Sequence, residues 1–177
     1  MIESTYLSIV VTGRNDDYGG DFNDRLEACI NWTSLLVENY KIPTELILVN
    51  YNPILAKPSL QEQLNWPQDR EYLSIKIITI PEEVHKDYID PKVRKTVPLF
   101  EFPAKNAGIR RARGEIILST NADILFHPTI FHFISQGRIK SESYYRTDRF
   151  DYNKIEYNEI KDINSYLNKI KANVFKI

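Results

Sequence analysis

Short apolar runs alternate with segments of helical periodicity along most of this chain, and this alternation constrains its fold more than any other feature. The runs cover residues 7–11, 45–49, 73–80 and 115–119. Each has the length and the β-branched content of a buried strand. Because strands that alternate with helices form parallel βαβ units, the sequence predicts an α/β fold with a mainly parallel central sheet flanked by helices.

The segments between these runs show the spacing and the end signals of helices. An apolar face predicts a long helix that starts after Asp21, its expected N-cap, and ends before Pro43. The other predicted helices cover residues 60–66, 101–113, 128–136 and 162–175. We also expect a fifth strand at 143–147 and a long polar loop at 81–98.

Composition limits the classes of protein to which the chain can belong. Its 177 residues predict one domain spanning 1–177. The formal net charge of -1 gives no basic excess, so we expect no nucleic-acid partner. A single cysteine, Cys29, excludes an internal disulfide and favours a reducing compartment. The early residues have neither a signal-peptide pattern nor an apolar run of membrane-spanning length, which predicts a cytoplasmic protein that can also act at a membrane surface.

Polar residues follow three of the predicted strands, at the point where each strand ends. These polar segments are residues 13–16, 50–52 and 121–123. Open parallel sheets bind their ligands outside the carboxyl ends of the strands. Because these ends meet at one edge, the sequence predicts a ligand site there.

Asn121 and Asp123 stand in the turn after the fourth predicted strand. An amide oxygen and a carboxylate two residues apart can point toward one ion, and hard oxygen ligands suit Mn²⁺ or Mg²⁺. Such an ion would neutralise a diphosphate leaving group. An Asx turn, in which both side chains only cap the next segment, explains the same residues without an ion.

The residues leading into this turn carry a resemblance. The pattern consists of Asn106, Gly108, Ala112, Gly114 and Asp123, with an apolar strand between the last two. It resembles the signature of GT-A fold glycosyltransferases of the family-2-like group, in which a Lys-Asn-x-Gly helix leads through Ala-x-Gly-Glu to an Asp-x-Asp turn. The resemblance covers about residues 8–126 and implies a single GT-A-type, Rossmann-like domain.

The resemblance assigns roles to residues at the strand ends. It implies that Asp123 binds the metal and that Asn121, in place of the family's first Asp, lies near the ribose and the metal. From the resemblance and the strand ends together, the nucleotide-binding candidates are Thr12, Arg14, Asn15, Asp16, Asn50, Lys105, Asn106 and Asn121. The chain departs from the family at Asn121, a poorer ligand than a carboxylate, and at residues 50–53, which lack the usual acidic residue.

The activity that the resemblance implies is transfer of a sugar from a nucleoside diphosphate sugar to a hydroxyl acceptor. The acceptor would be a glycan, lipid-linked or protein-linked, in surface glycan or polysaccharide assembly. Asp148 and Asp151, in a stretch of alternating charged and aromatic residues, are the candidate catalytic bases. An exposed edge strand guarded by charges explains that stretch equally well.

Two other functions stay open. The part of the chain after Asp123 is shorter than the second half of the resembling fold, so the chain can also be a non-catalytic nucleotide-sugar-binding module or half of a larger transferase. A sugar nucleotidyltransferase is also α/β and metal-dependent, but residues 13–16 do not form its Gly-rich phosphate loop. The predicted helix at 162–175 carries a basic, apolar face, which can dock on a membrane or a protein partner or pack on the domain's own sheet.

Overall fold

The structure is a computed structural model that describes residues 4–94, 96–152 and 160–175. The chain divides into two compact units, Met1–Leu125 and Phe126–Ile177. The single domain expected from the sequence stays a prediction. Within the described ranges, no helix is both long and apolar enough to cross a bilayer.

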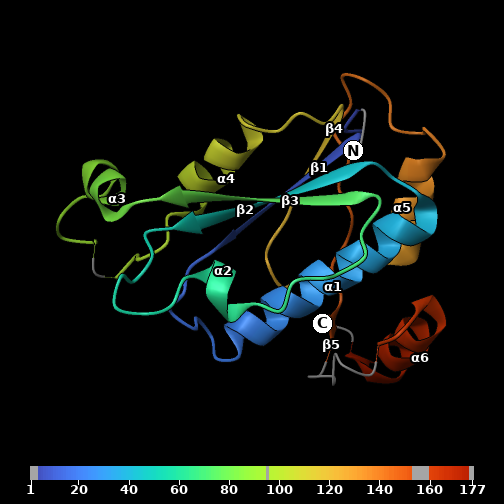
Figure 1. Cartoon of the computed structure of the whole chain (residues 1–177), viewed down its shortest axis with the longest axis horizontal. Coiled ribbons are helices and arrows are strands. Elements are labelled where there is room, and N and C mark those ends of the chain that lie inside the picture. Colours follow the sequence, from blue (N-terminus) through green and yellow to red (C-terminus); the bar gives the residue numbers. More distant parts are fainter. Residues whose placement is uncertain (1–3, 95, 153–159, 176–177) are drawn as a thin grey trace. The chain divides into compact units, whose positions relative to one another are not determined.

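The first unit is built around a four-stranded sheet in which all strands are parallel (Figure 1). Its strands are β1 (Leu7–Gly13), β2 (Thr44–Tyr51), β3 (Leu73–Ile80) and β4 (Ile116–Ser119). Their order in the sheet is β3-β2-β1-β4. All four predicted strands are confirmed, and so is the α/β fold with a parallel sheet. This arrangement is compatible with a Rossmann-like fold.

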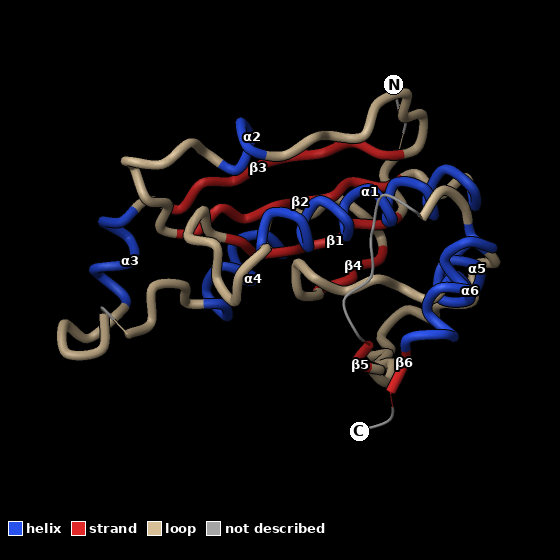
Figure 2. The backbone as a smooth tube through the Cα atoms, turned by 90° about the horizontal axis from the view of Figure 1, so that it is seen from below, coloured by secondary structure: helices blue, strands red, loops and turns tan. Residues whose placement is uncertain are grey.

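Helices cover both faces of this sheet (Figures 1 and 2). The helices α1 (Phe22–Tyr40) and α2 (Leu60–Gln63) lie on one face, and α4 (Glu101–Ile109) packs on β1 and β2 from the other. Every residue of β1 and β2 is therefore buried, which is why these strands are continuous apolar runs without alternation.

The helices of the first unit differ from the sequence prediction in several places. Asp21 does occupy the N-cap position of α1, but its side chain makes no capping bond; Asp17 Oδ1 instead accepts the Phe22 amide hydrogen bond at 2.8 Å. The expected loop at 81–98 contains a helix, α3 (Glu82–Tyr88). The helix expected over 101–113 ends at Ile109, because the chain then turns toward β4.

Close packing of α4 on the sheet depends on Gly108. A Cβ at this position would lie 2.5 Å from Val10 Cγ1 and 3.0 Å from Val49 Cγ2. Only a residue without a side chain lets the helix approach the sheet this closely. One of the glycines that carries the resemblance is thus explained by packing alone.

The second unit contains α5 (Pro128–Ser135), α6 (Ile163–Asn173) and an antiparallel pair, β5 (Asp151–Tyr152) with β6 (Val174–Phe175). The helices expected at 128–136 and 162–175 are confirmed with shorter bounds. On α6, Tyr166 is buried, and the neighbouring apolar residues of its stripe that the structure describes are half-buried. This stripe is therefore covered to a large extent by the protein itself.

The fifth strand expected at 143–147 is wrong. Residues 143–150 form no strand with any described part of the chain, and all of them are exposed. Their alternating pattern favours an extended backbone. An extended segment becomes a strand only when it hydrogen-bonds to a neighbour, and sequence alternation alone does not supply one.

Candidate functional site

The carboxyl ends of β1, β2 and β4 lie at the same edge of the sheet. Gly13 is aligned with Asn50 across the β1–β2 pair, and the Thr120 amide donates to the Val10 carbonyl at 3.1 Å. The structure thereby brings residues 13–16, 50–52 and 121–123 to one edge, which we call the carboxyl edge. Ligands of open parallel sheets bind at such an edge.

Arg14 connects the loop after β1 to the loop after β2. Its Nε donates to the Asn52 carbonyl at 2.6 Å, and its Nη1 forms an ion pair with Asp16 Oδ2, also at 2.6 Å. Both charged side chains are largely buried. The charge of Arg14 is therefore neutralised within its own loop, which leaves it less free for a ligand phosphate than the sequence suggests.

Asn15 ties the same two loops together more tightly. Its Nδ2 donates to the carbonyls of Ile54 and Pro58, each at 3.0 Å, and its Oδ1 accepts from the Ile54 amide at 2.7 Å. The residue is 3% exposed. Because the amide already uses both donors and its oxygen, Asn15 shapes the edge instead of reaching into it.

Thr12 and Asn50 line the base of the carboxyl edge. Both are buried at the ends of their strands. The Asn50 Oδ1 atom has no hydrogen-bond partner among the described residues. A buried acceptor without a donor is energetically unfavourable, so a donor from a bound ligand would stabilise it.

Asp123 forms an ion pair with Arg25, a residue that the sequence did not predict as part of the site. Arg25 Nη1 lies 2.8 Å from Asp123 Oδ2, and Arg25 Nη2 donates to the carbonyls of Tyr18 at 2.5 Å and Gly20 at 3.3 Å. Arg25 thus joins the loop after β1 to the turn after β4. The only sequence signal is its place in the first turns of α1, directly after the Gly-rich loop.

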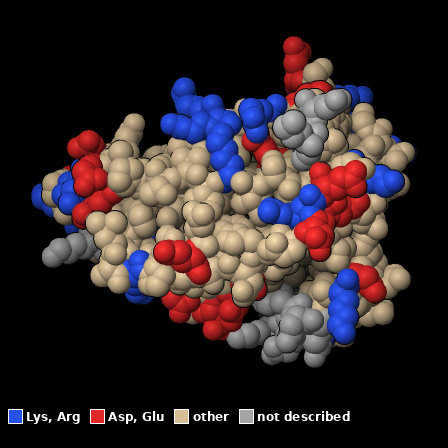
Figure 3. Space-filling model, viewed as in Figure 1, with Lys and Arg blue, Asp and Glu red and all other residues tan. Residues whose placement is uncertain are grey.

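Asn121 contacts Lys105, the second positively charged side chain at this edge. Lys105 Nζ donates to Asn121 Oδ1 at 2.8 Å and pairs with Glu101 at 2.6 Å. Asn106, the neighbouring candidate, is exposed and accepts from Arg110 at 3.0 Å on the surface of α4. The structure therefore brings Lys105 to the turn but not Asn106. Lys and Arg side chains gather over α4 on the face shown in Figure 3.

The residues at the turn fit a divalent ion poorly. Of the two predicted ligand residues, Asp123 contacts Arg25 through Oδ2, and Asn121 contacts Lys105 through Oδ1. Among the described residues, no three His, Cys, Asp or Glu side chains form a group that could hold a metal. An ion bound by these two residues would lie beside both positively charged side chains, which would repel it. Mn²⁺ or Mg²⁺ binding stays a prediction.

The two candidate bases belong to the second unit. Asp148 is exposed, and Asp151 Oδ1 lies 3.1 Å from Arg149 Nε. A general base needs a carboxylate within reach of the acceptor hydroxyl. Their role in catalysis stays a prediction.

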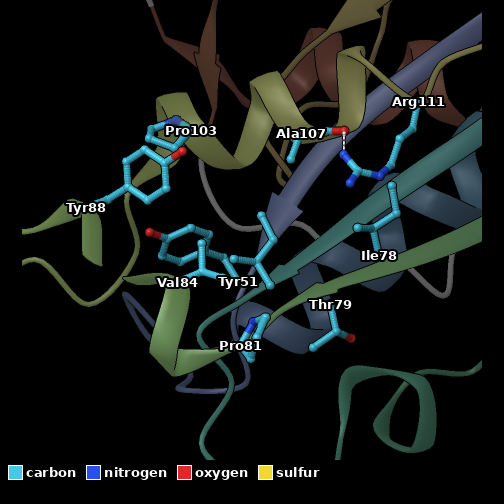
Figure 4. A pocket seen from close by; sticks show the side chains of 10 residues that line it. Tyr51, Ile78, Thr79, Pro81, Val84, Tyr88, Pro103, Ala107 and Arg111 are labelled. Carbon is cyan, nitrogen blue, oxygen red and sulfur yellow. Dashed lines mark hydrogen bonds between the residues drawn. The ribbon is translucent and has the colours of Figure 1, made fainter. Parts of the chain in front are cut away.

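A pocket of about 310 Å³ opens beside β3, between α3 and α4 (Figure 4). It is lined by Tyr51, Ile78, Thr79, Ile80, Pro81, Val84, Tyr88, Pro103, Ala107 and Arg111. Arg111 donates to the Ala107 carbonyl at 3.0 Å, and the Tyr51 hydroxyl lies 3.2 Å from His85 Nδ1. The sequence did not predict this pocket, because α3 was taken for a loop.

Cys29 is not a candidate nucleophile. The residue is 1% exposed, and burial raises the pKa of its thiol to about 12. Nucleophilic cysteines require a thiolate at neutral pH, which such a pKa prevents.

The opposite, amino edge of the sheet holds a buried polar cluster. Glu45 Oε1 accepts from Ser8 Oγ at 2.7 Å and from the Arg113 amide at 2.6 Å, and the Gly114 amide donates to Ser8 Oγ at 2.8 Å. A Cβ on Gly114 would lie 2.6 Å from the Ser8 nitrogen. Gly114, a second residue of the resemblance, therefore serves the fold at the edge away from the turn.

Comparisons with known proteins give no family for this chain. No model of a known protein family matches it, and a search of curated protein sequences finds no significant match. A function must therefore be argued from the geometry of the carboxyl edge and from the sequence resemblance.

Proposed function

We propose that the first unit binds a nucleoside diphosphate sugar at the carboxyl edge, as the donor-binding part of a glycosyltransferase. The proposal rests on one observation: three polar strand ends lie together at this edge. There, Arg25 and Lys105 donate hydrogen bonds to the side chains of the turn after β4. A donor with a charged diphosphate needs fixed cationic donors, and a nucleoside needs buried polar groups. The carboxyl edge offers both.

Each part of the donor has a place in this proposal. The diphosphate would contact Arg25 and Lys105, whose contacts join the loop after β1 and helix α4 to the turn. The nucleoside would lie toward Asn50. The Oδ1 atom of this residue has no partner among the described residues and can accept a hydrogen bond from a base N–H or a ribose hydroxyl. The rigid contacts of Arg14 and Asn15 would hold the two loops in a preformed shape.

The transfer step follows from ordinary glycosyl chemistry. The acceptor hydroxyl oxygen forms a bond to the anomeric carbon of the sugar, and the bond from that carbon to the diphosphate oxygen breaks. The nucleoside diphosphate leaves with the bonding electrons. A carboxylate takes the acceptor's proton, and Asp148 and Asp151 are the candidates for this role.

A second candidate function is a nucleotide-sugar-binding module without turnover, or half of a larger transferase. One observation favours it. All nucleotide-binding candidates belong to the unit Met1–Leu125, whereas both candidate bases belong to the other unit. In this alternative, the first unit binds the donor without help from the bases, and the chain does not transfer the sugar.

A thermal-shift screen of nucleoside diphosphates and their sugars, each with Mn²⁺ and with EDTA, tests the proposal. A ligand that binds the folded state raises the melting temperature by mass action. Asn50→Ala should weaken binding of the best ligand up to about tenfold, the effect of one hydrogen bond to a buried group. The control Asn168→Ala, on the exposed surface of α6, should leave the affinity unchanged.

Two outcomes of the screen separate the possibilities. If no nucleoside diphosphate shifts the melting temperature in either buffer, the proposed function is wrong. If a donor binds but is neither hydrolysed nor transferred to any hydroxyl acceptor, the binding-module alternative replaces the enzyme.

A further inference from the structure

We propose that Arg25 and Lys105 bind the donor's diphosphate directly, without a divalent ion, and that Asp123 is a positioning residue for Arg25. This inference rests on the proposed function, because it concerns the same edge and the same ligand. It changes the role of the turn, because Asp123 would hold the Arg25 side chain and would not bind a metal ion.

The loop after β1 surrounds the guanidinium of Arg25. Nη2 donates to the Tyr18 and Gly20 carbonyls while Nη1 donates to Asp123, and the Arg25 side chain is 25% exposed. A Cβ on Gly19 would lie 3.1 Å from Nη2, so the loop backbone fits closely around this group. Contacts from the loop after β1 and from the turn after β4 thus hold Arg25 in a fixed position. Part of its side chain stays accessible to solvent.

Both cations keep donors for a ligand. A guanidinium has five N–H donors, and the contacts to Asp123, Tyr18 and Gly20 use three of them. An ammonium has three, and Lys105 uses two, on Asn121 and Glu101. The remaining N–H groups can donate to phosphate oxygens, and charge-assisted bonds of this kind are strong and directional.

The same geometry disfavours an ion on Asp123. A divalent ion that shared Oδ2 with Arg25 would lie within about 5 Å of the guanidinium nitrogen, given the 2.8 Å contact and ordinary ion–oxygen distances. Like charges at that distance repel each other. An ion on Asn121 would also lie beside the Lys105 ammonium, which donates to the same oxygen. Arg25 and Lys105 already supply the positive charge that an ion would bring.

The test measures binding of inorganic pyrophosphate in EDTA, and of uridine diphosphate in EDTA and in Mn²⁺, by isothermal titration calorimetry. The wild-type protein should bind both ligands in EDTA. Arg25→Gln and Lys105→Gln should each weaken that binding by about tenfold to a hundredfold, the effect of a lost charged hydrogen bond. Arg70→Gln, an exposed arginine of the same unit, is the matched control and should bind like the wild type.

Asp123→Asn separates the two roles of the aspartate. An asparagine oxygen still accepts from Arg25, so binding in EDTA should weaken only about threefold. A metal ligand would respond differently: binding would require Mn²⁺ and would be lost in Asp123→Asn, and this result would overturn the inference while leaving the proposed function intact. If the wild type binds neither ligand in any of these buffers, the inference is overturned. The proposed function is wrong only if no nucleoside diphosphate of the thermal-shift screen binds.

Circular dichroism melts show whether each variant is folded. Arg25→Lys provides a second variant, which keeps the charge but has fewer donors for Tyr18 and Gly20. It should bind pyrophosphate more tightly than Arg25→Gln and less tightly than the wild type. Equal affinities of Arg25→Lys and Arg25→Gln in EDTA would contradict a direct role for the charge.

Discussion

The two edges of the central sheet use similar residue types in different ways. At the amino edge, Glu45 and Ser8 are fully buried, and their partners come from the chain before β4. At the carboxyl edge, Asp123 is 40% exposed, and its cationic partner keeps unused donors. A buried polar cluster whose members hydrogen-bond to one another stabilises the fold, whereas an exposed cluster with unused donors can bind a ligand.

The electrostatics of Glu45 show how the amino edge holds a buried charge. Burial raises the pKa of this carboxyl, but the hydrogen bonds from Ser8 and the Arg113 amide, with the charges of Arg113 and Lys76, outweigh burial and hold the pKa below its usual value. Glu45 is thus stabilised as a carboxylate in the folded protein.

The largest loss of stability is expected from Gly114→Ala at the amino edge. The new methyl group would collide with the Ser8 backbone, which cannot move without disturbing β1, so unfolding should become easier by about 3 kcal/mol. Urea denaturation measures the change. Gly20→Ala is the control: its Cβ would meet nothing within 4 Å, and its φ of 72° should cost only about 1 kcal/mol. Equal losses would mean that the amino edge is not tightly packed.

Glu45→Gln should destabilise the protein by about 2 kcal/mol at neutral pH, because a charged hydrogen-bond acceptor is lost from the buried cluster. The pKa of Glu45 is lower in the folded state than in the unfolded one, so its contribution is present above the ordinary value of 4.5 and is lost as the pH falls through the folded-state pKa. The difference between variant and wild type should therefore shrink in acid. A difference that stays constant from pH 7 to acid would contradict the lowered pKa.

Asn15→Ala should have a somewhat smaller effect, about 1.5 kcal/mol, although Asn15 lies at the carboxyl edge. The variant leaves the Ile54 amide and the carbonyls of Ile54 and Pro58 without their partner. Chemical denaturation measures this loss, with Asn168→Ala as the control. A loss no larger than that of the control would show that Asn15 does not shape the carboxyl edge.

Asp123→Asn should have the smallest effect on stability, below about 0.5 kcal/mol, because half-exposed ion pairs contribute little to folding. The same denaturation experiment measures it beside Glu45→Gln. If Asp123→Asn destabilises the protein as much as Glu45→Gln does, the contrast between the two edges fails, and the Arg25–Asp123 pair is part of the fold's framework.

The sheet was predictable because its determinants are local. β3 is rich in isoleucine, and the buried strands β1 and β2 are apolar runs that need no alternation to be recognised. The helix α3 was missed because it is short and rich in charged residues, and the strand expected at 143–147 was wrong because no neighbour pairs with it. Strand formation depends on a partner that local sequence does not contain.

The candidate site was predictable in position but not in its contacts. Parallel strands place their carboxyl ends at one edge, so the three polar segments could be found from the strand ends alone. The partner of Asp123 could not, because Arg25 lies 98 positions away in the sequence. Asn15 was expected to face a nucleoside, and its polar groups are instead satisfied by residues 39 and 43 positions away. Polarity in a loop does not reveal whether the side chain turns outward or inward.

The end of the sheet at β3 bears on how the protein behaves at high concentration. β3 has β2 on one side and no strand of the described chain on the other, so one row of its backbone groups can recruit a strand from another molecule. Lys76, exposed at the middle of the strand, is its only charged residue. A lysine on an edge strand opposes such pairing, because two copies would bring like charges together. Acetylation of Lys76 would remove this charge from the eight-residue strand and is therefore expected to favour pairing between two copies along β3.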